Sequence, residues 1–315
     1  ISEELKRKVE MICRFAYVDY TITNGNIKSI KNTNIAMVKP HIVKIKGIDY
    51  LIFDECDDIF INGYKEKIKF KDFEEYIKLD LFKYSKYNRY LKYQEKHKDL
   101  SLEDVVIRIE LNMDKTYYED SEFIKNPDEI TTLANKYYEI PEDYEPKDLV
   151  DMEDDYANNM YGTLTLRKEA YEKFKEMCNA SRKDGVKFYA ESAYRGYNYQ
   201  NIIYKNYIDE NGQEKADKYA ARPGFSEHEL GLALDLANIW TITTKGEEYK
   251  WLSKNAYKYG YIIRYKKEWE DITGYSAESW HIRYVGVKAA SVIQKENITY
   301  EEYYAKYILT KKSSK

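Results

Sequence analysis

The stretch GFSEHELGLALDLANIW, residues 224–240, decides how this chain must fold. Residues 231–237 read as a buried strand, yet Asp235 stands among its leucines and alanines. A carboxylate removed from water is costly unless an arginine, several backbone amides or a metal ion meets it. His228, one of only 4 histidines in the chain, lies shortly before this aspartate and favours the metal ion.

Composition narrows the class of protein. A length of 315 residues suggests about two domains. With 43% hydrophobic and 34% charged residues, the chain has the composition of a soluble globular protein rather than a disordered one. The net charge of -4 offers no basic excess for nucleic acid. No apolar run approaches the roughly 18 residues of a transmembrane helix. We therefore expect no nucleic-acid partner and no transmembrane segment in this chain. We also expect a monomer.

The start of the chain and its cysteines say little about function. The sequence begins at Ile1 without a methionine, so we expect that an upstream segment was removed or omitted, and the absence of a signal peptide or membrane anchor here is uninformative. Cys13, Cys56 and Cys178 are scattered and form no CxxC pair. They predict neither a disulfide framework nor a thiolate zinc site, and we interpret them as small apolar residues.

The N-terminal part alternates strand-like and helical patterns. A hairpin is expected over residues 35–43 and 45–53, where Pro40 favours an edge position. Amphipathic helices are expected over 70–84 and 87–96, and Ser101 with Asp104 has the spacing of a capping box. We divide the chain into an accessory region of unknown function over 1–100, a connecting segment over 101–146, a main domain over 147–309 and a tail over 310–315. Acids and prolines at 126–146 indicate a surface linker.

The main domain interleaves helices with short strands. A helix that includes Leu166 and Met177 on one face should end at Gly185. Further helices are expected over 197–207, over 247–259 before Gly260, and at the C-terminus, where Thr299 and Glu302 form a capping box. Strands are expected over 186–190, 231–237, 261–265 and 280–285. This pattern predicts an α+β fold, a small antiparallel sheet flanked by helices and preceded by a smaller N-terminal region.

Three residues form a candidate metal site. A catalytic zinc ion commonly takes three ligands from histidine and carboxylate and leaves a fourth position open, and His228, Asp235 and His281 supply such a set. Glu278 lies three residues before His281, where a general base could reach water beside the metal. Alone, each residue has an ordinary explanation: a packed histidine, an aspartate paired with lysine, a solvated glutamate. His41 and His97 receive no role.

In combination, these residues resemble the zinc D-alanyl-D-alanine carboxypeptidase family typified by VanY and the L,D-carboxypeptidase LdcB. The resemblance rests on SEHELGLALD at 226–235, ESWH at 278–281 and SAYRGYNYQ at 192–200. It covers residues 147–309 and is strongest over 186–286. Residues 100–120 also look like the region that often precedes this domain. The resemblance implies a zinc domain of the Hedgehog/DD-peptidase-like type.

The same resemblance implies roles for individual residues. His228, Asp235 and His281 would bind Zn²⁺, and Glu278 would act as catalytic base and then acid. Arg195 would contact the substrate near the scissile carbonyl and stabilise its oxyanion.

Other positions of the family motif concern the substrate. Gln200 and Ser226 match positions expected to line the substrate site. Ala193 and Gly196 stand where the family usually has glycine and serine, which puts the local turn and substrate preference in doubt, but not the zinc site.

The implied activity is removal of a C-terminal residue, D-alanine first among the candidates, from the stem peptides of peptidoglycan. Such a zinc metallocarboxypeptidase would act outside the cytoplasm, at the cell surface or in the wall. Two alternatives stay open: an endopeptidase that cuts between L-alanine and D-glutamate, and a zinc-stabilised wall-binding module without turnover. Glu278 argues against the module, because a purely structural metal site needs no base.

Overall fold

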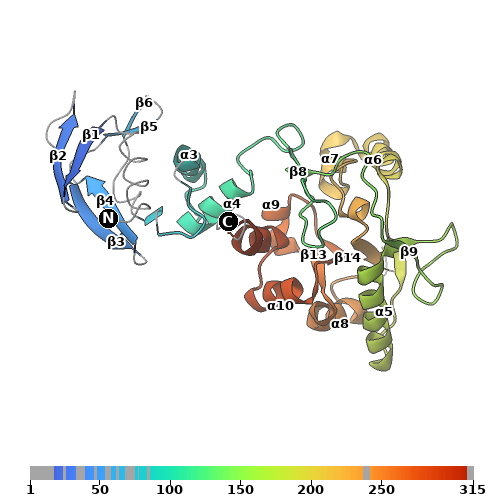
Figure 1. Cartoon of the computed structure of the whole chain (residues 1–315). Coiled ribbons are helices and arrows are strands. Elements are labelled where there is room, and N and C mark those ends of the chain that lie inside the picture. The colour runs from blue at the N-terminus through green and yellow to red at the C-terminus, as the bar shows by residue number, and fades with distance from the viewer. Residues whose placement is uncertain are drawn as a thin grey trace. The chain divides into compact units, whose positions relative to one another are not determined.

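The computed structural model describes the backbone of six short strands within residues 18–67, and then residues 75–76, 78–83, 86–236 and 242–310. The chain divides into two compact units, Ile1–Val106 and Ile107–Lys315. Figure 1 shows the elements and labels many of them.

The strands of the first unit pair as three antiparallel hairpins: β1 (Val18–Thr23) with β2 (Asn26–Asn32), β3 (Pro40–Ile45) with β4 (Ile48–Phe53), and β5 (Asp58–Ile61) with β6 (Tyr64–Lys67). The β3–β4 pair confirms the expected hairpin, although its first strand starts at Pro40. Residues 35–39 of that prediction lie outside the described part of the chain.

The helical prediction for the first unit is confirmed in part. Helix α3 (Tyr87–Lys96) has the expected bounds. The helix expected over 70–84 does not continue through 78–83, where the amide of Phe82 donates to the carbonyl of Leu79 in a tight turn. The ring of Tyr76 packs edge-on against Tyr87, 5.5 Å between centroids. The aromatic pattern in residues 70–84 therefore reflects packing in this buried cluster and not a continuous helix.

Helix α4 (Leu102–Glu110) starts as the capping-box spacing predicts. The amide of Asp104 donates to the Ser101 hydroxyl over 3.1 Å. The division between the two units falls within this helix.

A four-stranded antiparallel sheet forms the centre of the second unit. Its order is β11 (Ala190–Ser192), β12 (Ala233–Leu236), β14 (Glu278–Tyr284) and β13 (Tyr261–Tyr265). Two smaller pairs accompany it: antiparallel β9 (Leu149–Asp151) with β10 (Thr165–Arg167), and parallel β7 (Glu122–Phe123) with β8 (Tyr138–Glu139). The predicted α+β class with a small antiparallel sheet is confirmed.

Helices surround this sheet, and several begin or end where the sequence predicts. They are α5 (Lys168–Lys183), α6 (Tyr197–Asn211), α7 (Gln213–Tyr219), α8 (Glu247–Asn255), α9 (Glu270–Thr273), α10 (Val287–Glu296) and α11 (Tyr300–Tyr303), with single turns η2 (Glu227–Leu230), η3 (Ala256–Tyr259), η4 (Lys267–Trp269) and η5 (Tyr304–Leu309). Gly260 ends the α8–η3 segment at φ 82°, and a Cβ there would lie 2.6 Å from the Tyr284 ring, so only glycine fits. None of the described helices has the length and apolarity that crossing a membrane requires.

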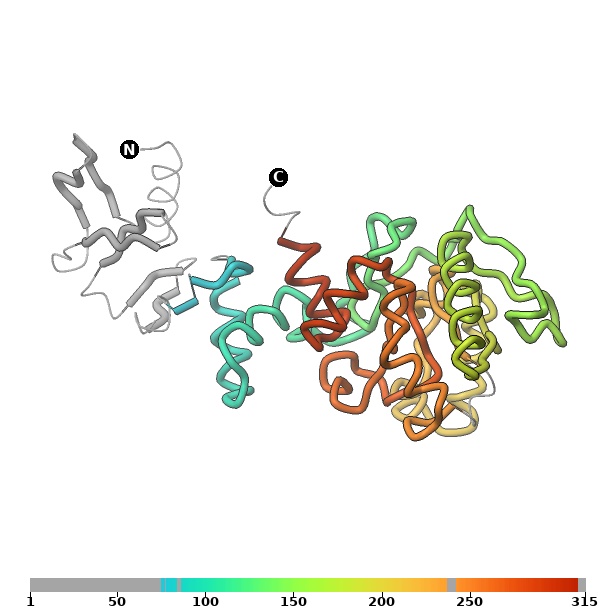
Figure 2. Tube along the Cα trace, turned by 90° about the horizontal axis from the view of Figure 1, so that it is seen from below, coloured from blue at the N-terminus to red at the C-terminus, as the bar shows by residue number. Residues whose placement is uncertain are grey.

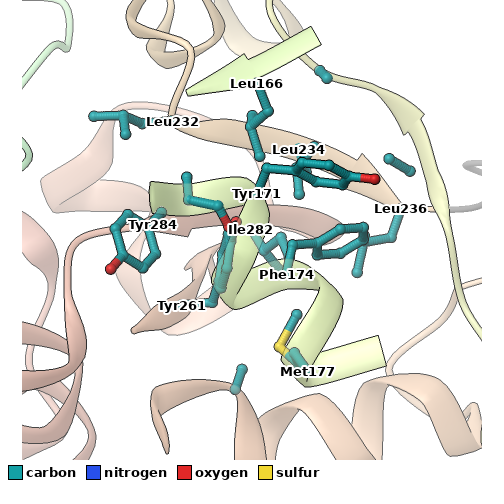
Figure 3. Close-up of a cluster of buried hydrophobic side chains, with 14 of the residues drawn as sticks. Leu166, Tyr171, Phe174, Met177, Leu232, Leu234, Leu236, Tyr261, Ile282 and Tyr284 are labelled. Atoms are coloured by element: carbon teal, nitrogen blue, oxygen red, sulfur yellow. Dashed lines mark hydrogen bonds between the residues drawn. The ribbon is translucent and has the colours of Figure 1, made fainter. Parts of the chain in front are cut away.

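The main hydrophobic core lies between the sheet and α5. Figure 3 shows Leu234 and Leu236 of β12 close to Phe174 and Met177 of α5, with Ile282 of β14 beside them. Alternate residues of a strand point to opposite faces. Ala233 and Asp235 therefore point away from this core, which answers how an aspartate can stand in an apolar strand.

The strand expected over 186–190 begins only at Ala190. The apolar alternation of residues 186–190 correctly predicted that Phe188 is buried, since its side chain is only 2% exposed. The backbone before Ala190 follows a different path, because the Val186 amide donates to the carbonyl of Ser181 in α5 and not to a neighbouring strand.

The segment at 126–146, expected as a surface linker, is in large part packed. Ala134 and Ile140 belong to the core of the second unit, and the Ile140 amide donates to the carbonyl of Gly224 over 2.7 Å. The hydroxyl of Tyr300 in α11 lies 3.4 Å from the carbonyl of Thr132. Figure 2 shows this segment and the C-terminal helices side by side. The acids and prolines of this segment predict an exposed linker, and no local pattern in the sequence indicates these long-range contacts.

Candidate metal centre

The motif around His228 is a single tight turn. Ser226 starts η2, its hydroxyl accepts from the His228 amide over 3.4 Å, and the Glu229 carboxylate accepts from the Ser226 amide in return. Gly231 ends the turn in the left-handed region at φ 62°, where a Cβ would lie 3.0 Å from the side chain of Arg167. Serine, glutamate and glycine therefore fix the backbone that carries the histidine.

Asp235 and His281 are direct neighbours on β12 and β14. Glu278 lies on the same strand as His281, and three residues apart would normally place the two side chains on opposite faces. The pairing of β13 with β14 shifts between Ile263 and Tyr265, so β14 carries extra residues at this point. This bulge turns Glu278 toward His281. The strand expected from residue 280 thus starts two residues earlier, at Glu278.

Ligand atoms of His228, Asp235 and His281 converge. His228 Nε2 lies 3.3 Å from Asp235 Oδ2, and His281 Nδ1 lies 3.2 Å from Asp235 Oδ1. All three residues are buried, and the atoms that could bind a metal lie within 4.8 Å of one another. The predicted ligand set is therefore brought together on one side of the sheet.

The hydrogen bonding of His228 fits a metal ligand. Its Nδ1 lies 2.6 Å from the carbonyl oxygen of Ala193, which can only accept, so Nδ1 carries the proton and Nε2 a lone pair. Burial and the nearby charge of Arg195 lower the pKa of His228 to about 4, which keeps the ring neutral near pH 7. Nε2 has no hydrogen-bond partner among the described residues. A buried lone pair without a donor is what a divalent cation would satisfy.

Glu278 stands beside the ligand set without joining it. Its Oε2 lies 3.6 Å from His281 Nδ1. Burial raises the pKa of Glu278 to about 7, with the Asp235 charge acting in the same direction. A carboxylate whose pKa lies close to the working pH is suited to take up and return a proton.

Arg195 reaches the same centre from the loop after β11. Its Nη1 lies 3.3 Å from Asp235 Oδ2 and 3.2 Å from the Ser192 hydroxyl. Its backbone amide donates to the carbonyl of His228, which ties the two motifs together. Arg195 is thus where the sequence expects it, and its action on substrate stays a prediction.

The two residues expected to line the substrate site contact the protein's own backbone. Gln200, on α6, is buried, and its amide donates to the carbonyl of Ala221 over 2.8 Å, just before the His228 motif. Ser226 caps the turn of His228. Both side chains therefore shape the loop beside the centre, and contact with substrate stays a prediction for them.

Sequence reasoning missed two carboxylates that flank His228. Glu229 accepts from the Gly224 amide over 2.9 Å, in addition to its bond to Ser226. The Ser–x–x–Glu spacing of a capping box could have revealed it. Glu227 lies 3.4 Å from His281 Nε2 and is enclosed by arginines of the sheet. Arg264 and Arg283 lie in two strands that the sequence predicts, and a buried arginine requires an acidic partner, which was the available signal for Glu227.

The other two histidines stay outside the centre. His97 stacks on Tyr93, 4.2 Å between ring centroids, in the first unit. The side chain of His41 lies outside the described residues.

Comparison with known proteins identifies the family. The family VanY, described as D-alanyl-D-alanine carboxypeptidase, matches residues 163–287. The putative carboxypeptidase YodJ of Bacillus subtilis (strain 168) is 42% identical over 211 residues, which cover 62% of this chain and 77% of that protein. The chain belongs to the VanY family. The predicted family and its class, that of metallocarboxypeptidases, are thereby confirmed.

Further VanY relatives agree in sequence and fold. A D-alanyl-D-alanine carboxypeptidase of Enterococcus faecium is 36% identical over 177 residues, 54% of this chain and 56% of that protein. The structure of the LdcB LD-carboxypeptidase matches with a TM-score of 0.56 at 42% identity, over 61% of this chain and 92% of that one. VanYB in complex with D-alanine-D-alanine matches with a TM-score of 0.50 at 31% identity, over 56% of this chain and 98% of that one.

Proposed function

We propose that this protein is a zinc-dependent carboxypeptidase that removes a C-terminal D-alanine from peptidoglycan stem peptides. The observation that carries the proposal is the convergence of His228, Asp235 and His281 with Glu278 beside them, in a chain of the VanY family. Relatives named as D-alanyl-D-alanine carboxypeptidases, and the binding of D-alanine-D-alanine by VanYB, support the substrate class.

Zinc is the metal that the ligand set favours. Two imidazoles and one carboxylate with a further position open are typical of a catalytic zinc site, whereas calcium and magnesium prefer oxygen ligands alone. When bound, zinc would polarise the scissile carbonyl and make water more acidic. His228, Asp235 and His281 would hold it.

The chain's own groups would carry the proton and the charge. Glu278 would take a proton from the attacking water and return it to the leaving amine, as its position and raised pKa allow. Arg195 would donate a hydrogen bond to the oxygen that becomes negative. Because peptidoglycan lies outside the membrane, the protein would act outside the cytoplasm, at the cell surface or in the wall.

Synthetic stem peptides test this function. The zinc-loaded protein is incubated with a pentapeptide that ends in D-alanyl-D-alanine and with the tetrapeptide that lacks the last residue. Mass spectrometry should show loss of one alanine from at least one peptide, and which peptide is shortened distinguishes a D,D- from an L,D-carboxypeptidase. Glu278→Gln is the matched control, because it should keep the fold and lose the reaction.

Two outcomes would contradict the proposal. If neither peptide is shortened by zinc-loaded protein, the chain is not a carboxypeptidase of this class. If peptides that begin at D-glutamate are released from intact cell walls, as a cut between L-alanine and D-glutamate would give, the enzyme is an endopeptidase.

A further inference from the structure

A cluster of buried charges lies behind His281 on the side away from the candidate metal position. Arg264 and Arg283 are 1% and 0% exposed, and Glu227 and Glu301 are 2% and 1% exposed. Arg264 Nε lies 2.9 Å from Glu227 Oε1, and its Nη1 lies 3.0 Å from Glu301 Oε2. Arg283 Nη1 lies 3.4 Å from the same Glu227 oxygen. Two positive and two negative charges thus balance.

Stability alone does not explain this cluster. Buried ion pairs can often be replaced by packed apolar side chains without loss of stability, because the cost of removing charges from water is as large as their attraction. The four residues come from η2, β13, β14 and α11, so the chain brings them together from distant parts of the sequence. A role in organising a neighbouring group is a better reason to bury them.

That neighbouring group is His281. Both guanidinium groups approach Oε1 of Glu227, whereas Oε2 lies 3.4 Å from His281 Nε2. Ion pairs with Arg264 and Arg283 favour the ionised carboxylate of Glu227. An ionised carboxylate only accepts hydrogen bonds, so Nε2 of His281 must carry the proton. Nδ1 is then the ring nitrogen left to bind a metal ion, and it lies 3.2 Å from Asp235 Oδ1.

We propose that Glu227 is the positioning residue of His281, and that Arg264, held in turn by Glu301, fixes Glu227 in place. The inference rests on the proposed metal centre. It assigns the two histidines different supports: His228 is oriented by the main-chain carbonyl of Ala193, and His281 by a side-chain carboxylate. Outer acceptors of this kind fix the ring orientation and raise the basicity of a ligand histidine.

Zinc titration of Glu227→Gln tests the proposal. Glutamine keeps the size of the side chain but removes the charge that faces Nε2 and the arginines. We expect zinc affinity, measured by competition with a chelating dye, to weaken about 10–100-fold. Circular dichroism and thermal unfolding of the metal-free protein establish that the variant is folded.

Asp217→Asn is the matched control. Asp217 is also a buried carboxylate, 8% exposed, and holds Arg222 through two hydrogen bonds of 2.9 and 2.8 Å. It lies on α7, and its hydrogen bonds go to Tyr204 and Arg222 rather than to a candidate ligand. Its loss should lower stability and leave zinc affinity within about twofold of the wild type. A similar weakening in both variants would mean that Glu227 acts through general stability, which would overturn the proposal.

A spectroscopic measurement can overturn the proposal even if Glu227→Gln does not fold. Long-range ¹H–¹⁵N spectra of the zinc-loaded wild type should show His281 with a proton on Nε2 and none on Nδ1. The opposite tautomer, or unchanged zinc affinity in a folded Glu227→Gln, would overturn the positioning role while leaving the proposed function intact. A wild type that binds no zinc would overturn the metal centre, and the positioning role with it.

Discussion

The two faces of the β11–β12–β14–β13 sheet are built from alternating residues of the same strands, and both are buried. On one face Leu234 and Ile282 are paired neighbours within the core that packs on α5. On the other face the next pair along, Asp235 and His281, meets His228. The apolar face is complete once its side chains pack. The polar face leaves Nε2 of His228 buried and without a hydrogen-bond partner among the described residues, as a metal ligand would be before the ion binds.

The polar face itself holds two kinds of buried charge. The cluster of Arg264, Arg283, Glu227 and Glu301 contains its own counter-charges. In the candidate metal centre, Asp235 lies near Arg195 and His281, and Glu278 lies near His281. Nε2 of His228 nevertheless has no hydrogen-bond partner among the described residues. Burial of charge therefore marks a binding site only where the donors and acceptors do not satisfy one another.

The largest expected effect lies on the polar face. Glu278→Gln should lower kcat by about 10²–10⁴, because a positioned general acid–base contributes that much. Metal content and thermal unfolding should stay as in the wild type, because Glu278 stands beside the ligand set. Near-normal turnover in a folded, metal-loaded variant would show that Glu278 has another role.

A substitution on the apolar face should lower the stability of the protein rather than its activity. Leu234 is fully buried, and Leu234→Ala should reduce the free energy of unfolding by about 2–5 kcal/mol. The folded fraction should keep its metal, because Leu234 points away from the ligands. Chemical denaturation and metal analysis check both statements. If Leu234→Ala lost its metal without losing stability, the two faces would not have separate roles in stability and metal binding.

Arg195→Ala should cost about 3–4 kcal/mol of transition-state stabilisation, the range for removal of an oxyanion donor. The loss should appear in kcat with metal retained, and Arg195→Lys should rescue it only in part because the planar fork is gone. Steady-state kinetics distinguish stabilisation of the oxyanion from simple binding of the substrate. A rise in KM alone would make Arg195 a uniform binder of the substrate carboxylate.

The smallest effect is expected at the start of α11, the helix that carries Glu301. Thr299 caps this helix and accepts from the Glu302 amide over 3.1 Å. Thr299→Ala should lower the free energy of unfolding by about 0.5–2 kcal/mol, whereas Thr299→Ser, which keeps the hydroxyl, should lose less. Equal losses in thermal denaturation would show that packing, not capping, is what Thr299 provides.

Local signals predicted the elements whose ends are set by single residues. Gly260 ends the α8–η3 segment, Thr299 and Glu302 begin α11, and strand β13 has the bounds that its composition predicts. The ligand set could be predicted because short motifs carry it. The sequence could not show that a bulge turns Glu278 toward His281, because the register depends on pairing with a distant strand.

Long-range packing explains the other misses. Glu227 was overlooked because its partners Arg264 and Arg283 lie on strands far along the chain. The segment at 126–146 looked exposed because Ile140 meets its partner Gly224 only in the folded state.

Metal analysis of the purified wild type and of His228→Ala tests whether His228, Asp235 and His281 hold a zinc ion. We expect one zinc ion per chain in the wild type, and its loss in His228→Ala, because the buried Nε2 of that residue would be a ligand. The wild type without a stoichiometric divalent ion, even after zinc is added back, would contradict it.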